Sequence, residues 1–238
     1  MPEYQHYSFD LWLTLIRSNP AFKPARTAFF HHNFNYKDKP MEEVARIFRQ
    51  VDLMVNAINE KTGKNIDADE MYLMVISLMN DGDIAVGDID MPALMTEIER
   101  MLFANLPLVY SAETIEVLAH LKNNTPATIN ILSNTGFISG KSLRKVLAEI
   151  GLAQYFDFQL YSDETRMSKP SAAFFGLMLE HVQQLHGAVN HENIIHIGDN
   201  PVADVQGATA AGIKSMLVNS NNVSIKNLIK HASNILTT

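Results

Sequence analysis

Helix and strand patterns alternate along this chain from residue 112 onward. Apolar runs at 127–132, 156–161, 193–197 and 215–218 predict strands, and stretches at helical spacing separate them. The expected helices span 112–122, 141–150, 171–185 and 202–211, and Gly151 and Gly212 end the second and the fourth. Strands joined by helices predict a parallel sheet covered on both faces, which is an α/β fold. An apolar run at 7–12 predicts one more strand.

Residues 17–107 have a different character, because helical patterns dominate there. Apolar residues recur at helical spacing between Val44 and Ile58, and similar patterns cover 70–79 and 92–103. Methionines are frequent in this stretch, and we expect them to pack in its interior (Met71, Met74, Met79, Met91, Met95 and Met101). We therefore predict a sheet core formed by 1–16 and 108–238, with an all-helical insertion at 17–107.

Composition removes several classes of function. The chain has no cysteine, which excludes disulfides, thiolate nucleophiles and zinc–cysteine sites. Its net charge of −7 disfavours binding along nucleic acid, and no apolar run reaches the roughly 20 residues that span a bilayer. The N-terminus lacks the pattern of a signal peptide. We expect a cytoplasmic protein with neither nucleic acid nor membrane as partner; the oligomeric state leaves no readable pattern.

Reactive side chains stand where the predicted strands end. Asp10 closes the first strand, Ser133 and Asn134 follow the second, and Lys169 precedes Pro170. Each of these patterns alone is typical of an ordinary turn or of a solvated lysine. Together they comprise a carboxylate that could attack phosphorus, a hydroxyl and backbone N–H groups that could bind phosphoryl oxygens, and an ammonium that could balance the charge. Ligands of parallel sheets bind at this edge.

A pair of aspartates follows the strand at 193–197. Asp199 and Asp204 flank a tight turn that leads into a helix, where acids often serve only as caps. After a buried strand they also suit Mg²⁺, which prefers oxygen ligands and takes one or two carboxylates. Asp10 and Asp199 would supply those carboxylates, the backbone carbonyl of Trp12 a third ligand, and Asp204 would orient the ligand shell.

These four segments, in this order, resemble the motifs of the haloacid dehalogenase superfamily over nearly the whole chain. They are residues 9–15, 131–136, 168–170 and 197–204. The resemblance implies a Rossmann-like core, a helical cap after the first motif and Mg²⁺. It also implies hydrolysis of a small phosphorylated metabolite through an aspartyl-phosphate, with Asp10, Ser133 and Lys169 as catalytic residues. The stretch from Ile197 to Gly212 is especially similar to the phosphatase members.

Two positions depart from that family pattern. Phosphatase members usually have a second aspartate two residues after the nucleophile, as general acid and base, but this chain has Trp12. We therefore expect a slow phosphatase, one that prefers good leaving groups, or one whose cap provides the acid. Leu13 stands where the family often has glycine, and it is expected to crowd the loop.

Two other functions remain open. The 2-haloacid dehalogenases also have an aromatic residue two positions after the nucleophile, a Ser-Asn pair and a lysine, but they need no Mg²⁺ and usually lack the acid at the position of Asp199. Retention of Asp199 and Asp204 favours the phosphatase. Alternatively, Trp12 could mark an inactive member that only binds a phosphorylated ligand.

Several cations follow the first strand, and Asn134, Trp12 and Arg17 are the predicted substrate-binding residues. Arg17 is favoured among the cations because it lies at the expected hinge between core and cap. We expect most of the others to lie on a solvated helix face (Lys23, Arg26, His31 and His32). His196, inside an apolar strand, is expected to be a buried and hydrogen-bonded histidine rather than a ligand.

Overall fold

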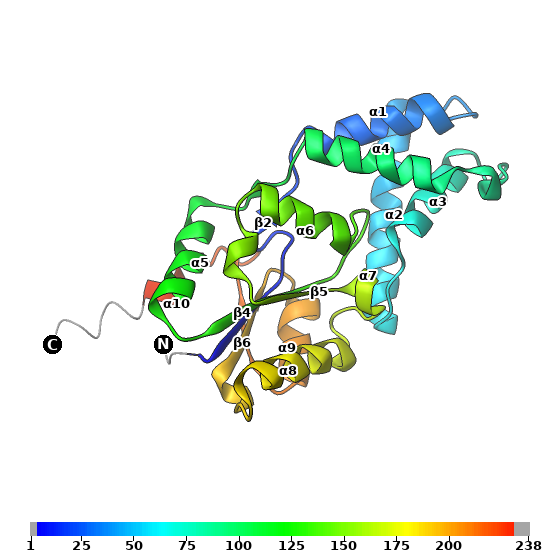
Figure 1. Ribbon diagram of the computed structural model, residues 1–238. Helices are drawn as coiled ribbons and strands as arrows, with labels where there is room; N and C mark the ends of the chain where they lie inside the picture. Colours follow the sequence, from blue (N-terminus) through cyan, green and yellow to red (C-terminus); the bar gives the residue numbers. More distant parts are fainter. Residues whose placement is uncertain (1–3, 231–238) are drawn as a thin grey trace.

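The computed structural model of this protein describes residues 4–230. Its centre is a five-stranded parallel sheet in the order β5-β4-β1-β6-β7 (Figure 1). The strands are β1 (His6–Phe9), β4 (Thr128–Ser133), β5 (Phe158–Tyr161), β6 (Ile194–Gly198) and β7 (Lys214–Leu217). The chain proceeds from β1 to one side and then returns to the other, so the point where the strand order reverses lies beside β1. This arrangement confirms the predicted α/β fold.

Helices cover both faces of this sheet. They are α5 (Ala112–Asn124) and α6 (Gly140–Glu149) on one face, and α8 (Ala172–His186) and α9 (Gly207–Ala210) on the other. Neighbouring residues of a strand point to opposite faces: Ile131 packs with the α5 and α6 side, whereas Leu132 packs against α8. Because side chains of an apolar strand point alternately to the two faces of the sheet, each face has its own apolar core. Short helical turns connect these elements: η2 (Ala153–Tyr155), α7 (Ser162–Thr165), η3 (His191–Asn193) and α10 (Asn227–Lys230).

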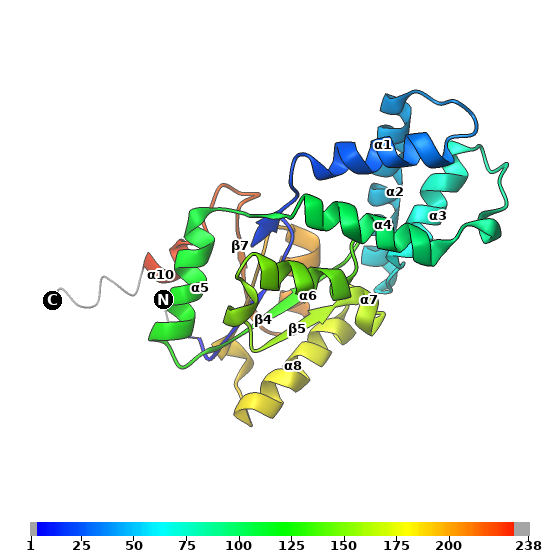
Figure 2. The same cartoon turned by 45° about the horizontal axis from the view of Figure 1, so that its top comes forward.

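A helical unit, residues 22–104, lies beside the sheet (Figure 2). It consists of α1 (Phe22–Phe34), α2 (Met41–Thr62), α3 (Ala68–Met79), the turn η1 (Val86–Asp88) and α4 (Met91–Ala104). Its interior is a third apolar cluster that contains Met71, Met79 and Met101, with the other three predicted methionines partly buried around it. Asp90 caps the start of α4, where its side chain accepts a hydrogen bond from Ala93 N.

The helical unit joins the sheet through two short strands. Strand β2 (Ile16–Arg17) pairs antiparallel with β3 (Leu108–Val109), so both crossings between the two parts of the chain lie side by side. The sequence indicated little strand character here, because a two-residue strand is too short to show an alternating pattern. We refer to β2 and β3 as the hinge strands.

Local details differ from expectation at three further places. Helix α1 was not singled out, since its apolar face includes an arginine and a threonine among its buried residues. The first strand ends at Phe9 rather than at residue 12. The helix expected at 202–211 begins as a π-helix, η4 (Pro201–Gln206). None of the helices among residues 4–230 combines the length and apolar character needed to cross a bilayer.

Candidate active site

Asp10 lies at the carboxyl end of the central strand. Phe9 is in register with Ile131 of β4 and Ile197 of β6, so the residues after these strands meet at one edge of the sheet. The Asp10 backbone N–H donates to the carbonyl of Ile197 at 2.8 Å, and Thr14 Oγ1 donates to Asp10 Oδ2 at 3.1 Å. These bonds fix the orientation of a carboxylate that is only 7% exposed.

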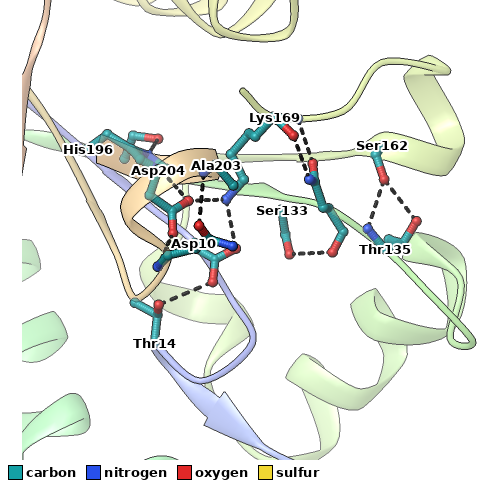
Figure 3. A network of polar contacts seen from close by, with 12 residues as sticks. Asp10, Thr14, Ser133, Thr135, Ser162, Lys169, His196, Ala203 and Asp204 are labelled. Atoms are coloured by element: carbon teal, nitrogen blue, oxygen red, sulfur yellow. Dashed lines mark hydrogen bonds and ion pairs between the residues drawn. The ribbon is translucent and has the colours of Figure 1, made fainter. Parts of the chain in front are cut away.

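Lys169 joins two carboxylates from opposite ends of the chain. Its Nζ lies 2.8 Å from Asp10 Oδ1 and 2.6 Å from Asp204 Oδ1, and its side chain is 1% exposed (Figure 3). Asn134 holds the backbone of the same lysine, because its amide accepts from Lys169 N at 2.7 Å and donates to Lys169 O at 2.9 Å. Asp10 and Asp204 thus hold the side chain of Lys169, and Asn134 holds its backbone.

His196 completes the buried network from the sheet interior. Burial lowers the pKa of His196 and so favours a neutral ring. In that form its Nε2 donates to Asp204 Oδ1 at 3.0 Å and its Nδ1 accepts from Ser8 Oγ at 2.9 Å. The expectation of a buried, hydrogen-bonded histidine is confirmed.

The π-helix η4 gives Asp204 its position. Asn200 caps this helix through its side chain, and the Asn200 N–H donates to Asp204 Oδ2 at 2.9 Å. A Cβ atom on Gly198 would lie 2.1 Å from Asp204 Cγ, so only glycine leaves space for this carboxylate. Burial opposes its ionisation, but Lys169 and His196 outweigh burial, and the pKa of Asp204 falls well below its usual range.

Asp10, Asp199 and Asp204 place carboxylate oxygens within 4.8 Å of one another. Among the described residues, Lys169 forms ion pairs with Asp10 and Asp204 of this cluster, and none of the ion pairs there involves Asp199. Burial, followed by the charges of Asp10 and Asp204, raises the pKa of Asp199 to about 7. Burial also raises the pKa of Asp10 to about 6 despite Lys169. Hard oxygen donors with an excess of negative charge are the chemistry that suits Mg²⁺.

Two cavities meet at this edge of the sheet. The first, of about 420 Å³, is lined by Asp10, Lys169 and the two aspartates of the η4 region, together with Asn56 and Glu60 of α2. The second, of about 480 Å³, lies between α1, α2 and the loop after β4. Both are lined by Trp12, Leu13, Asn56 and Asn134, so the second cavity continues from the first.

The loop from Asp10 to Leu15 explains why a glycine would suit position 13. Leu13 has φ +58°, a left-handed conformation that costs most side chains about 1 kcal/mol. Its side chain is 53% exposed and lines both cavities. The backbone at Leu13 is therefore strained, and the residue lies where the two cavities meet; that it crowds the loop stays a prediction.

Ser133 and Arg17 occupy less direct positions than Asp10 and Lys169. Ser133 is fully buried at the end of β4, and its hydroxyl donates to the carbonyl of Asn134 at 3.1 Å. It lines neither cavity. Arg17 lies in hinge strand β2, where it is exposed and lines neither cavity either. The structure does not bring Arg17 to the site, because the hinge pairing turns it towards solvent.

Several residues of the helical unit line the cavities although they were not predicted as substrate-binding residues, and Asn56, Glu60 and Arg26 are among them. Asn56 and Glu60 are one turn apart on α2, and Arg26 lies on α1. Arg26 is 6% exposed, not solvated as expected. A signal was present in the sequence: Arg26 lies four residues from both Phe22 and Phe30, on the apolar face of its helix.

Sequence comparison identifies relatives over part of the chain. Haloacid dehalogenase-like hydrolase domain-containing protein 3 of Danio rerio is 26% identical over 130 residues, which are 54% of this chain and 50% of that protein. Pyrimidine 5'-nucleotidase YjjG of Escherichia coli is 28% identical over 107 residues, or 45% and 44% of the two chains. The chain thus spans half or less of the length of these curated relatives.

Solved structures share the fold over the whole chain. The HAD-hydrolase YfnB from Bacillus subtilis, in a magnesium-bound form, superposes with a TM-score of 0.70 at 17% identity and covers 98% of this chain and 99% of its own. A 2-haloacid dehalogenase from Pseudomonas syringae has a TM-score of 0.65 at 19% identity and 98% coverage of both. Residues 7–218 match the profile of the haloacid dehalogenase-like hydrolases. With its aspartates, lysine and parallel sheet in this arrangement, the chain belongs to that family of hydrolases.

Proposed function

We propose that this protein is a Mg²⁺-dependent phosphatase that hydrolyses small phosphomonoesters through an aspartyl-phosphate on Asp10. The observation that supports this most is the arrangement of Asp10: it is held by Lys169 and Thr14, and it opens into a cavity beside Asp199 and Asp204. A pyrimidine 5'-nucleotidase among the relatives agrees with phosphomonoester chemistry.

Mg²⁺ would be held by the carboxylates of Asp10 and Asp199 and by the carbonyl of Trp12, while Asp204 orients the ligand shell. The raised pKa of Asp199 and its place beside two other carboxylates fit a group that shares a divalent ion. When bound, Mg²⁺ neutralises charge on the phosphoryl oxygens and so permits attack by an anion.

The proposed hydrolysis has two steps. Asp10 forms a bond to phosphorus while the bond to the alcohol oxygen breaks, and the alcohol leaves with a proton. Water then attacks phosphorus, the Asp10–phosphorus bond breaks, and inorganic phosphate is released. Lys169 and Thr14 orient the two oxygens of Asp10 throughout. Asn134, which lines the Asp10 cavity, is the proposed phosphoryl-binding residue; Ser133 would join it only if its hydroxyl turned from the Asn134 carbonyl towards the cavity.

Because position 12 is a tryptophan, the departing alcohol lacks the proton donor that is usual in phosphatase members of the family. Glu60 on α2 is the carboxylate of the helical unit that lines the Asp10 cavity, and its Oε1 accepts from Asn200 Nδ2 at 3.1 Å. It is our candidate for the acid supplied by the cap. A positioned acid contributes about 10²–10⁴-fold to rate, so phosphatase activity with poor leaving groups depends on such a residue.

In this proposal the helical unit acts as a cap that opens and closes over Asp10. The end of α2 contacts the loops at the edge of the sheet: Ser162 Oγ donates to Asn65 Oδ1 at 2.7 Å, and the Ser168 N–H donates to the Gly63 carbonyl at 3.0 Å. The paired hinge strands would permit rotation while they keep the connection short. The B. subtilis relative is described as showing interdomain movement.

The test is phosphate release from sugar phosphates, nucleotides and p-nitrophenyl phosphate, with Mg²⁺ or with EDTA. We expect Mg²⁺-dependent release that Asp10→Asn abolishes and that Asp88→Asn, on an exposed turn, leaves intact. Release that persists in Asp10→Asn would refute the nucleophile. If no phosphate is released, halide release from 2-chloropropionate in EDTA would identify a dehalogenase, and Mg²⁺ binding without turnover would identify a ligand-binding member.

A further inference from the structure

Arg26 is a buried cation without a carboxylate partner. It is 6% exposed, and none of the ion pairs among residues 4–230 involves it. Its Nε atom is buried without a hydrogen-bond partner. A buried charge is unfavourable unless it is paired, so this position is incomplete in the protein alone.

Aromatic rings hold the Arg26 guanidinium in place. Its Cζ lies 4.1 Å from the centre of the Phe48 ring, 4.5 Å from that of Phe137 and 5.6 Å from that of Phe22. Tyr72 is a further, neutral partner: its hydroxyl accepts a side-chain hydrogen bond from Arg26 and donates to the Phe137 carbonyl at 3.0 Å. Ring faces stabilise a cation without neutralising it. The arrangement therefore orients the guanidinium and preserves its positive charge.

The guanidinium lines the second cavity, and the charges around that cavity are mainly positive. Lys23, Arg26 and Arg49 contribute cations, and Asp52 contributes a carboxylate that already pairs with Arg49 at 3.0 Å. This local excess is opposite in sign to the net charge of −7 of the whole chain. The cavity thus suits an anion and not a neutral or cationic group.

The second cavity also continues into the Asp10 cavity past Trp12 and Asn134. One molecule can therefore place a phosphoryl group against Asp10 and another group against Arg26. The rings of Trp12, Phe48 and Phe137 line the path between them. A guanidinium binds both carboxylates and phosphates with paired hydrogen bonds.

We propose that Arg26 forms a second anion subsite, and that the substrate is a phosphomonoester with an additional carboxylate or phosphate at its far end. This proposal rests on the proposed phosphatase function for the position of the reacting phosphoryl group. The subsite would make the enzyme prefer such substrates over nucleoside monophosphates with neutral bases and over simple alkyl phosphates.

Matched substrate pairs test the subsite. We expect a 10–100-fold higher kcat/KM for 3-phosphoglycerate than for glycerol 3-phosphate if the second anion is a carboxylate. The same preference for fructose 1,6-bisphosphate over fructose 6-phosphate would indicate a phosphate. In Arg26→Met the ratio within the preferred pair should fall to near one, and in Arg26→Lys it should be intermediate. Arg46→Met, exposed on α2, should keep the wild-type ratio.

If the role of Arg26 were purely structural, Arg26→Met would lower kcat/KM for both substrates of a pair by the same factor. The ratio of the two values would then stay unchanged, which would overturn the proposal. A ratio near one for both pairs in the wild type would overturn it as well. Folding of each variant is checked by circular dichroism before the ratio is interpreted.

A binding measurement separates this proposal from the catalytic one. Malonate in EDTA should raise the Tm of the wild type and of Arg46→Met but not of Arg26→Met. If that shift appears and no phosphomonoester is hydrolysed, the subsite stands and the phosphatase function fails. If the shift is absent, or equal in Arg26→Met, the subsite is refuted whatever the enzyme hydrolyses.

Discussion

Trp12 occupies the position at which phosphatase members of the family usually have an aspartate that acts as general acid and base. Trp12 lines both cavities, one of them together with Asp10, and its backbone pairs with that of Ile16. We predict that Trp12→Asp raises kcat for alkyl phosphates by about 10²–10⁴-fold in a variant in which the cap acid is removed by Glu60→Gln. The rate with p-nitrophenyl phosphate should change much less, because that leaving group needs no proton.

The matched control at this position is Trp12→Asn, which opens the same space but cannot transfer a proton. Stopped assays over a series of leaving groups would compare the two variants. An equal gain in the asparagine variant would mean that removal of the indole, not proton donation, limits the rate.

At the scale of elements, the contact of α9 with α8 requires a glycine. A Cβ on Gly207 would lie 2.4 Å from Phe175 Cε2 and 3.1 Å from the Cα of Pro170, which follows Lys169. Phe175 is fully buried, so it cannot move aside. We predict that Gly207→Ala lowers the free energy of unfolding by about 1–3 kcal/mol through overpacking.

Gly176, inside α8, provides the contrast. No atom lies within 4 Å of a Cβ built there, so Gly176→Ala should raise the free energy of unfolding by about 0.5–1 kcal/mol through helix propensity. Urea unfolding of the two variants measures both effects. Equal effects of the same sign would show that packing between α8 and α9 does not decide the outcome.

Across the whole molecule, the acidic cluster joins the first strand to the last third of the chain. Mg²⁺ bound to Asp10 and Asp199 would stabilise only the folded protein, by about 2.7 kcal/mol at one hundred times its Kd. For a chain of this size that corresponds to a Tm increase of roughly 5–10 °C. Asp199→Asn should lose this increase, and its metal-free form should melt above the metal-free wild type because the repulsion is smaller.

Scanning calorimetry with Mg²⁺ and with EDTA makes this comparison, and Asp88→Asn should respond as the wild type does. A full Mg²⁺ shift in Asp199→Asn would place the ion elsewhere. Equal metal-free Tm values would show that the charges of the cluster are already well solvated.

How much of this could be predicted differs from one residue to the next. Asp10, Lys169, Asp199 and Asp204 were predicted together because their segments were expected at the carboxyl ends of the strands, and the structure brings all four to one edge. Arg17 was predicted from its place near the hinge alone. A two-residue strand turned it to solvent, and no pattern in the sequence specifies that pairing.

The amino-acid sequence by itself determined the parallel sheet, its helical insertion and the order of the site residues. These follow from apolar periodicity and from turn residues, which act over a few neighbouring positions. Only the tertiary structure decided that Arg26 is enclosed by Phe48 and Phe137, and that Lys169 pairs with Asp10 and Asp204 rather than with Asp199. Such burial depends on packing between segments far apart in the chain, and the desolvation it causes exists only after they have met.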